Sequence, residues 1–228
     1  MKITYIHHSS FSIELENCIL LFDYFEGKLP RFDKNKKLYV FSSHSHDDHF
    51  SKIIFDLEKE YPNTTYILSD DIKNTLSKNT LFVKPNQSII VDNLEIKTLK
   101  SNDLGVAFIV QAENKLFYHA GDLNYWHWED ELTDEENYNM GLSYKTELNK
   151  IKGLNFDVSF IPLDPRQGKQ YSLGFDTFMN TVNTKYAFPM HLWNDYSTVD
   201  KLLSDDISKN YRDKIIKVSK DFEEFILD

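Results

Sequence analysis

Apolar residues in the first part of the chain follow the patterns of β-strands. Residues 2–6 and 11–15 alternate between apolar and polar positions, whereas residues 18–22 and 38–41 are continuously apolar. Both patterns are typical of strands of four to eight residues. We therefore expect sheet structure in this region, with the last of these strands leading directly into a histidine-rich segment.

A helical pattern follows the histidine-rich segment. Apolar residues recur there at positions i, i+3, i+4 and i+7, namely Phe50, Ile53, Ile54 and Leu57. This spacing places them on one face of a helix. Asp47 or Asp48 can cap the start of that helix.

The rest of the chain predicts further strands and a few helices. The strands are expected at residues 65–68, 80–83, 88–91, 94–99, 106–111, 115–119, 158–162, 186–190 and 214–218. The helices are expected at residues 70–77, 144–151, 175–182 and 199–207. A strand-rich first part followed by mixed elements favours sheets covered by helices on the outside, in a single domain spanning residues 1–228.

Composition narrows the class of protein. A length of 228 residues favours one sizeable domain, and the net charge of −10 argues against a nucleic-acid partner. The single cysteine, Cys18, allows no disulfide within the chain. The N-terminus lacks a signal-peptide pattern, and no stretch of about 18 apolar residues predicts a membrane span. We expect a cytoplasmic protein without a membrane partner, and the oligomeric state stays open.

The main candidate for chemistry is the hexapeptide His44-Ser45-His46-Asp47-Asp48-His49. In an extended segment His44 and His46 point to the same side, and a turn would bring Asp48 and His49 to a second, adjacent position. Imidazole and carboxylate are ligands for zinc, and also for manganese or iron. The hexapeptide therefore predicts a metal-binding loop.

Two later segments could complete such a site. Asp122 follows Gly121 at the end of the strand predicted at residues 115–119, and His191 ends the strand predicted at residues 186–190. Both lie where a strand stops, as the hexapeptide does. Ligands at the ends of neighbouring strands can converge on one rim.

With these residues the chain resembles the metallo-β-lactamase fold superfamily. The resemblance rests on H-x-H-x-D-H after a strand, on Gly121-Asp122 and on Pro189-Met190-His191, and it spans residues 2–218. The strand ending Leu21-Phe22-Asp23 resembles an early family strand whose buried Asp steadies the metal loop. The segment His8-Ser9-Ser10-Phe11-Ser12-Ile13-Glu14 resembles, more loosely, the subgroup around ascorbate-6-phosphate lactonase.

The resemblance implies a fold and a ligand set. The fold would be an α+β, four-layer αββα sandwich with the metals at one edge of its two sheets. His44 and His46 would belong to a first metal position, and Asp48, His49 and His191 to a second. Asp122 would bridge the two positions, and Zn²⁺ would be the favoured metal, with one or two ions per chain and Mn²⁺ or Fe as alternatives.

One departure from the family pattern concerns the first metal position. The family has a third His there, but no His occurs between His49 and His119. Asp103 or Asn102 could take its place, and His119 could contribute or pack behind the site. We therefore expect the second position to be complete and the first to be weaker. His8 is a further candidate ligand or outer partner.

The predicted chemistry is hydrolysis by metal-activated water. A divalent metal lowers the pKa of bound water to roughly 7, and Asp48 could orient the nucleophile and pass a proton to the leaving group. Arg166 could bind an anionic group of a small-molecule substrate, or form a structural ion pair instead. Trp126, in the aromatic segment 124–128, could line the pocket, and part of residues 124–150 could form a lid.

The leading prediction is thus a hydrolase for a lactone, ester or phosphoester. Three alternatives remain: a nuclease or phosphodiesterase of the same fold, an iron redox protein, and a non-catalytic metal-binding protein. The acidic balance argues against the nuclease, and the absence of further cysteines weakens the redox reading.

Overall fold

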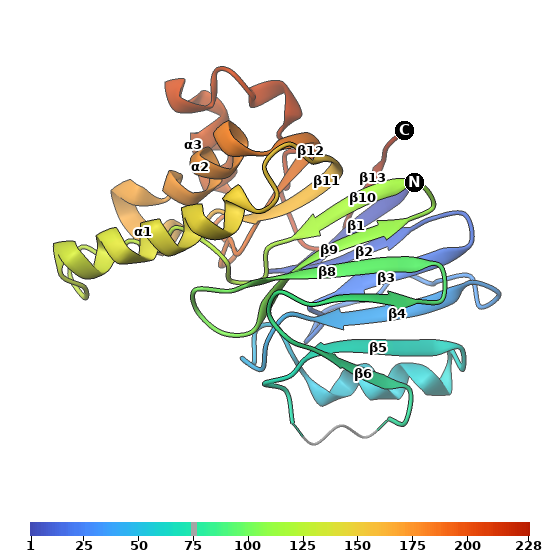
Figure 1. Cartoon of the computed structure of the whole chain (residues 1–228). Coiled ribbons are helices and arrows are strands. Elements are labelled where there is room, and N and C mark those ends of the chain that lie inside the picture. Colours follow the sequence, from blue (N-terminus) through green and yellow to red (C-terminus); the bar gives the residue numbers. More distant parts are fainter. Residues whose placement is uncertain (74–76) are drawn as a thin grey trace.

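The computed structural model describes residues 1–73 and 77–228, and its strands form two sheets. The first sheet contains, in spatial order, β13 (Glu223–Ile226), β1 (Lys2–His7), β2 (Ser10–Glu14), β3 (Cys18–Phe22), β4 (Lys37–Ser42), β5 (Thr64–Ser69) and β6 (Thr80–Val83). The second contains β12 (Asn183–Met190), β11 (Asn155–Pro162), β10 (Lys115–His119), β9 (Val106–Ala112), β8 (Leu94–Lys100) and β7 (Ser88–Val91). Figure 1 shows the strands of the two sheets stacked through the body of the molecule.

The continuously apolar strands lie in the middle of the first sheet. Cys18, Leu20 and Phe22 of β3 belong to the core between the sheets, whereas Ile19 and Leu21 belong to a second core on the outer face. β3 pairs in parallel with β4, as parallel strands buried on both faces do. The run of apolar residues therefore reflects a strand that is covered on both sides.

The outer face of the first sheet is covered by η1 (Lys52–Lys59), a 3-10 helix rather than the predicted α-helix. Ser51 caps it, so the prediction of Asp47 or Asp48 as the cap is wrong. Ile54 and Phe55 are its buried residues, while Ile53 is 40% exposed. A 3-10 helix has three residues per turn, so the side chains that share a face differ from those of an α-helix.

The second sheet is covered by α1 (Asp134–Asn149), α2 (Leu173–Thr181) and α3 (Ser197–Ser204), which gather on one side in Figure 1. Helix α1 begins ten residues before the predicted helix at residue 144, because Thr133 and Glu136 form a capping box there. With helices outside both sheets, the predicted four-layer αββα sandwich is confirmed. Shorter turns of 3-10 helix are η2 (Pro165–Gln170), η3 (Asp206–Ser208) and η4 (Arg212–Lys214).

The C-terminal predictions needed correction. Residues 214–218 form no regular strand: Ile215 makes one isolated bridge to Ala187. The last strand is β13, which pairs antiparallel with β1. The predicted helix at residues 199–207 is divided at Asp205, whose extended backbone ends α3 and whose side chain caps η3.

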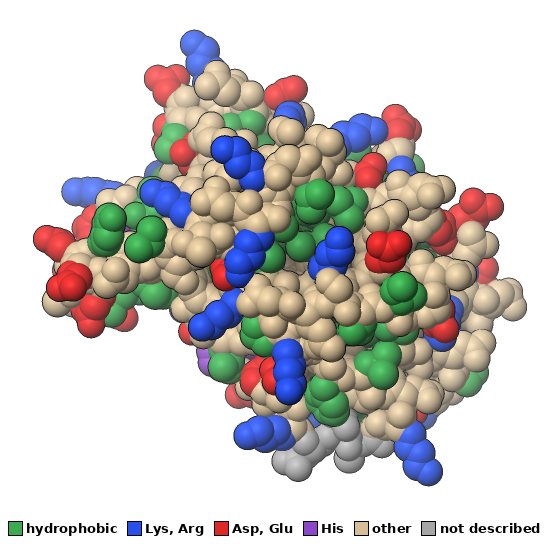
Figure 2. All heavy atoms as spheres, in the orientation of Figure 1, with side chains coloured by type: hydrophobic (Ala, Val, Ile, Leu, Met, Phe, Trp, Pro, Cys, Tyr) green, Lys and Arg blue, Asp and Glu red, His purple; other side chains and the backbone are tan. Residues whose placement is uncertain are grey.

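The predicted helix at residues 70–77 includes residues 74–76, which lie outside the described residues. Among the helices of the described ranges, none has the length and apolar character needed to cross a membrane. Figure 2 shows acidic and basic side chains interspersed over one face of the molecule.

Candidate metal centre

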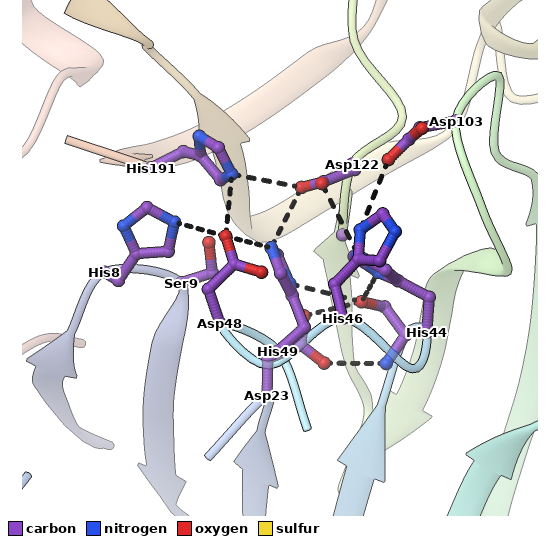
Figure 3. Close-up of polar contacts among 12 residues, drawn as sticks. His8, Ser9, Asp23, His44, His46, Asp48, His49, Asp103, Asp122 and His191 are labelled. Atoms are coloured by element: carbon purple, nitrogen blue, oxygen red, sulfur yellow. Dashed lines mark hydrogen bonds and ion pairs between the residues drawn. The ribbon is translucent and has the colours of Figure 1, made fainter. Parts of the chain in front are cut away.

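Loops from both sheets bring a group of His and Asp side chains to one edge of the sandwich. From the first sheet come residues that follow β1, β3 and β4: His8, Asp23 and the hexapeptide. From the second come residues that follow β8, β10, β11 and β12: Asp103, Asp122, Asp164 and His191. Figure 3 shows most of these side chains pointing toward a common centre.

Asp23 is hydrogen-bonded to the hexapeptide and to the residue before it. Its carboxylate is fully buried and accepts hydrogen bonds from the Ser43 backbone N, the Ser43 Oγ and His49 Nδ1, each at 2.7 Å. Ser43 Oγ in turn lies 2.9 Å from His44 Nδ1. Because Nδ1 of each imidazole is occupied in this way, Nε2 of His44 and of His49 is left to face the centre. The predicted role of Asp23 as a buried support agrees with this geometry.

A first group of possible ligands contains His44, His46, Asp103 and Asp122. Nε2 of His44 lies 3.0 Å from Nδ1 of His46 and 3.5 Å from Oδ2 of Asp122. Oδ2 of Asp103 lies 3.6 Å from Nδ1 of His46. Asp103 therefore lies beside His44 and His46, where the family pattern has a third His ligand.

A second group contains His8, Asp48, His49 and His191. Oδ2 of Asp48 lies 3.5 Å from His8 Nε2, 3.8 Å from His191 Nε2 and 4.0 Å from His49 Nε2. Three imidazole nitrogens therefore surround one carboxylate oxygen, and His8 joins the set of residues predicted for the second position.

Asp122 lies between the two groups. Its Oδ2 is the oxygen near His44, whereas its Oδ1 lies 3.0 Å from His49 Nε2 and 3.4 Å from His191 Nε2. One carboxylate therefore presents one oxygen to each group. This is the arrangement expected of a carboxylate that bridges two cations.

The residues present fit a bound metal. Of the buried side-chain atoms that have no hydrogen-bond partner among the described residues, four belong to this centre: Nε2 of His8, His49 and His191, and Oδ1 of Asp122. A buried polar atom left without a partner costs about 1–3 kcal/mol. Divalent cations held by the two groups would satisfy these atoms, with nitrogen and oxygen ligands of the type that zinc, iron and manganese accept.

Burial and neighbouring charges tune these groups. Burial lowers the pKa of His8 and of His44 to about 4, so both imidazoles are neutral, the form that binds metals. Burial alone would raise the pKa of Asp122, but the surrounding His side chains hold it well below its usual value. Burial would lower the pKa of His49, but the Asp122 and Asp23 carboxylates raise it well above its usual value.

The backbone at this edge is strained at three site residues. His8, Asp23 and His191 have φ angles of 52°, 45° and 64°, in the left-handed region that side-chain-bearing residues rarely adopt. Such strain costs about 1–3 kcal/mol per residue and is typical of functional sites. Gly121, next to Asp122, has a φ of 51°, and a Cβ there would lie 2.6 Å from Ser43 Cβ. The absence of a side chain at Gly121 lets the Asp122 turn approach the hexapeptide.

His119 and Asn102, the two other candidates for the missing ligand of the first group, make contacts outside that group. His119 is fully buried, with Nε2 bonded to the Ser9 carbonyl and Nδ1 accepting from the Gly121 N, and its ring stacks on Phe22. The Asn102 amide bonds to the backbone of Asn124. His119 therefore packs behind the site, and Asn102 fastens the loop that carries Asp103.

Sequence reasoning did not identify Asp164 as a partner of His191. Asp164 Oδ2 lies 2.9 Å from His191 Nδ1, and both oxygens pair with Arg166 at 2.6–3.0 Å. Burial opposes ionisation, but His191 and Arg166 lower the pKa of Asp164 to about 2. A signal was present: Asp164 follows an apolar strand in the same way as Asp23 does.

A cavity of about 310 Å³ opens onto the metal-binding groups. Its walls include three tryptophans, Met140 of α1, and Arg166. Trp126 is 5% exposed, and its Nε1 donates to the Asp122 carbonyl at 2.9 Å. Arg166 both lines this cavity and forms the ion pair that was its alternative role. Residues 124–150, considered above as a possible lid, contain α1, and Met140 of this helix forms part of the cavity wall.

Comparisons with known proteins agree on the fold. A sequence model of the family described as the beta-lactamase superfamily domain matches residues 2–191. The chain is similar to Igni18, a novel metallo hydrolase from the hyperthermophilic archaeon Ignicoccus hospitalis, with 16% identity, a TM-score of 0.63, and coverage of 100% of this chain and 99% of that chain. Comparison with curated proteins gives no match.

Two further solved structures differ in their chemistry. Isothiocyanate hydrolase from Delia radicum gut bacteria has 14% identity and a TM-score of 0.58, covering 100% of this chain and 99% of that chain. CmlA, a diiron beta-hydroxylase from Streptomyces venezuelae, has 10% identity and a TM-score of 0.53, covering 83% of this chain and 44% of that chain. At such low identity these similarities show the fold alone.

Proposed function

The chain belongs to the beta-lactamase superfamily domain family, and on that premise we propose that it is a metal-dependent hydrolase for a small-molecule lactone, ester or phosphoester. The observation that carries the proposal is Asp122, which presents one oxygen to each of two His and Asp groups beneath a cavity of about 310 Å³. A cavity of this size suits a small molecule.

The chain's own residues can be given roles in that reaction. His44, His46 and Asp103 would hold one metal, Asp48, His49 and His191 the other with His8 as an extra ligand, and Asp122 both. A bound divalent metal supplies water with a pKa of roughly 7 and polarises a substrate oxygen. Asp48 lies at the cavity wall, with its side chain 28% exposed. It orients the attacking water and then passes a proton to the leaving group.

Zinc is the metal that we propose, with manganese and iron as alternatives. Each group mixes imidazole nitrogen with carboxylate oxygen, a donor set that all three metals accept. The fold likeness to a diiron hydroxylase keeps an iron redox protein as the second candidate. Assays of the zinc-loaded and iron-loaded protein with and without an oxidant separate the hydrolase from the redox protein. Hydrolysis needs no oxidant, whereas iron redox chemistry does.

A nuclease is less well supported by the site. Arg166 is the only Lys or Arg that lines the metal cavity among the described residues, and the chain carries a net charge of −10. Nucleic-acid binding depends on several cationic contacts to phosphates. A small substrate, with lactone opening as one of its reactions, remains our proposal. Cys18 is buried and unpaired, which supports a reducing compartment such as the cytoplasm.

The test compares Asp48→Ala with Asp47→Ala. Asp47 is an exposed residue of the same hexapeptide that belongs to neither group. Purified protein is stripped with a chelator, reloaded with zinc, manganese or iron, and assayed on lactones, esters and phosphodiesters. We expect Asp48→Ala to lose about 100-fold or more of the turnover, as general acid–base catalysis contributes, and Asp47→Ala to keep it.

Metal content and circular dichroism are measured on both variants, so that loss of metal or of fold is recognised. Equal turnover of the two variants would remove Asp48 from the mechanism. If no metal form acts on any of these substrates, the chain is a metal-binding or redox protein instead.

A further inference from the structure

A second cavity adjoins the metal cavity. It measures about 330 Å³ and is lined by residues 127–131 and 166–169. Trp128 and Arg166 line both cavities. A substrate held at the metals could therefore extend past these two side chains into the second cavity.

Arg166 is fixed in position at this boundary. Asp164 binds its Nε and Nη2, and its guanidinium carbon lies 4.3 Å from the Trp193 ring centre and 5.5 Å from that of Trp128. No hydrogen bond from its Nη1 is found within residues 1–73 and 77–228. A clamped guanidinium loses little freedom on binding, so Nη1 is a ready donor for an anion.

Gln167 supplies a second donor to the same cavity. The residue is 4% exposed, and its Oε1 accepts a hydrogen bond from the His127 backbone N at 2.8 Å. That contact fixes the orientation of the amide. Nε2 is then a buried donor that finds no partner among the described residues. Such donors are rare in folded proteins and are typically satisfied by water or a ligand.

From these two donors we propose that the substrate ends, away from its reacting bond, in a carboxylate that binds Arg166 and Gln167. This inference rests on the proposed function and deepens it. A carboxylate offers two oxygens, and these can accept from a guanidinium and an amide N–H that line one cavity better than one neutral acceptor can. Gly168 leaves room beside them, since a Cβ there would meet no atom within 4 Å.

Charged side chains also line this cavity and bear on the choice of ligand. Lys169 favours an anion, whereas three carboxylates oppose it: Glu129, Asp130 and Glu131. All four side chains are on exposed residues, and Glu129 accepts a hydrogen bond from Gln170 at 3.1 Å. Water and salt screen exposed charges, whereas bonds to a buried donor keep their strength. Because the Arg166 side chain is itself 47% exposed, the buried Nε2 donor of Gln167 decides the specificity and Arg166 adds to it.

Gln167→Glu is a nearly isosteric test of this role. The substitution keeps an oxygen for the His127 N but replaces the Nε2 donor by a negative oxygen. Gln111→Glu is the matched control, because it adds the same charge at an exposed residue that lines neither cavity. Substrates are 4-nitrophenyl monoesters of glutarate, adipate and pimelate, each paired with an ester of equal length that ends in a methyl group.

We expect the metal-loaded wild type to prefer one carboxylate ester over its methyl partner by about tenfold or more in kcat/KM, mainly through KM. Gln167→Glu should lose that preference while its metal content stays at the wild-type level, and Gln111→Glu should retain it. Equal use of both esters by the wild type, or equal losses in the two variants, would overturn the inference.

A protein that turns over none of these esters would contradict esterase activity but would still allow a test of the carboxylate site. Adipate is then titrated by calorimetry into metal-loaded protein. Binding that weakens about tenfold in Gln167→Glu and is unchanged in Gln111→Glu supports the site. No binding, or equal affinities in all three proteins, rejects it.

Discussion

The two metal-binding groups differ in how firmly the protein holds them. In the second group the His8, His49 and His191 side chains are 4%, 0% and 2% exposed. In the first group His44 and the shared Asp122 are buried, while the His46 and Asp103 side chains are 51% and 43% exposed. The two groups therefore differ in burial, and a complete second position with a weaker first one stays a prediction.

The difference extends to the residues behind the ligands. Asp23 orients His49 and Asp164 orients His191, and both carboxylates are fully buried. Among the described residues, His46 has no such partner behind it: its Nδ1 contacts only its neighbours in the group. A buried carboxylate restricts the imidazole and makes it more basic, whereas an exposed side chain must be ordered when the metal binds. Orientation before binding therefore separates the two positions.

The largest effect is expected from Asp122→Ala, which should abolish the distinction between the positions. Because Asp122 contacts His44 in one group and His49 and His191 in the other, both metals should be lost. Turnover should fall about 1000-fold or more, since metal activation contributes several kcal/mol. Metal content by mass spectrometry checks this, together with a folding control by circular dichroism. One metal retained at wild-type affinity would show that Asp122 serves a single position.

An intermediate effect is expected from Asp164→Asn, directed at the second position. The amide cannot supply the negative charge that His191 and Arg166 share. Loss of such a supporting carboxylate typically weakens metal binding 10- to 100-fold. Competition with a chelator should show this loss at the tighter of two sites. Unchanged affinity there would mean that burial alone, and not orientation by carboxylates, distinguishes the second group.

The smallest effect is expected from Asp103→Ala, directed at the first position. Because the Asp103 side chain is 43% exposed and, among the described residues, forms an ion pair with His46 alone, we expect the affinity of the weaker site to fall by about tenfold or less. The tighter site should be unaffected. Asp103→His supplies the third imidazole and should tighten the weaker site. Two sites of equal affinity in the wild type, both insensitive to Asp103, would refute the asymmetry.

Local patterns explain which features could be predicted from the sequence. The hexapeptide, Asp122 and His191 each lie at the end of a recognisable strand, so their types and positions carried the signal. Helix α1 was predicted too short, since its apolar residues do not gather on one face before Tyr144. The final strand was misplaced because β13 alternates weakly and depends on its pairing with β1.

The sequence by itself determined the strands of the two sheets except β13, the family and most of the His and Asp side chains at the strand ends. Only the tertiary structure decided that Asp103 and His8 join those side chains and that Asp164 supports His191. The physical reason is distance along the chain. Strand and motif patterns arise from neighbouring residues, whereas these contacts form where loops of two separate sheets meet, and no local pattern records that meeting.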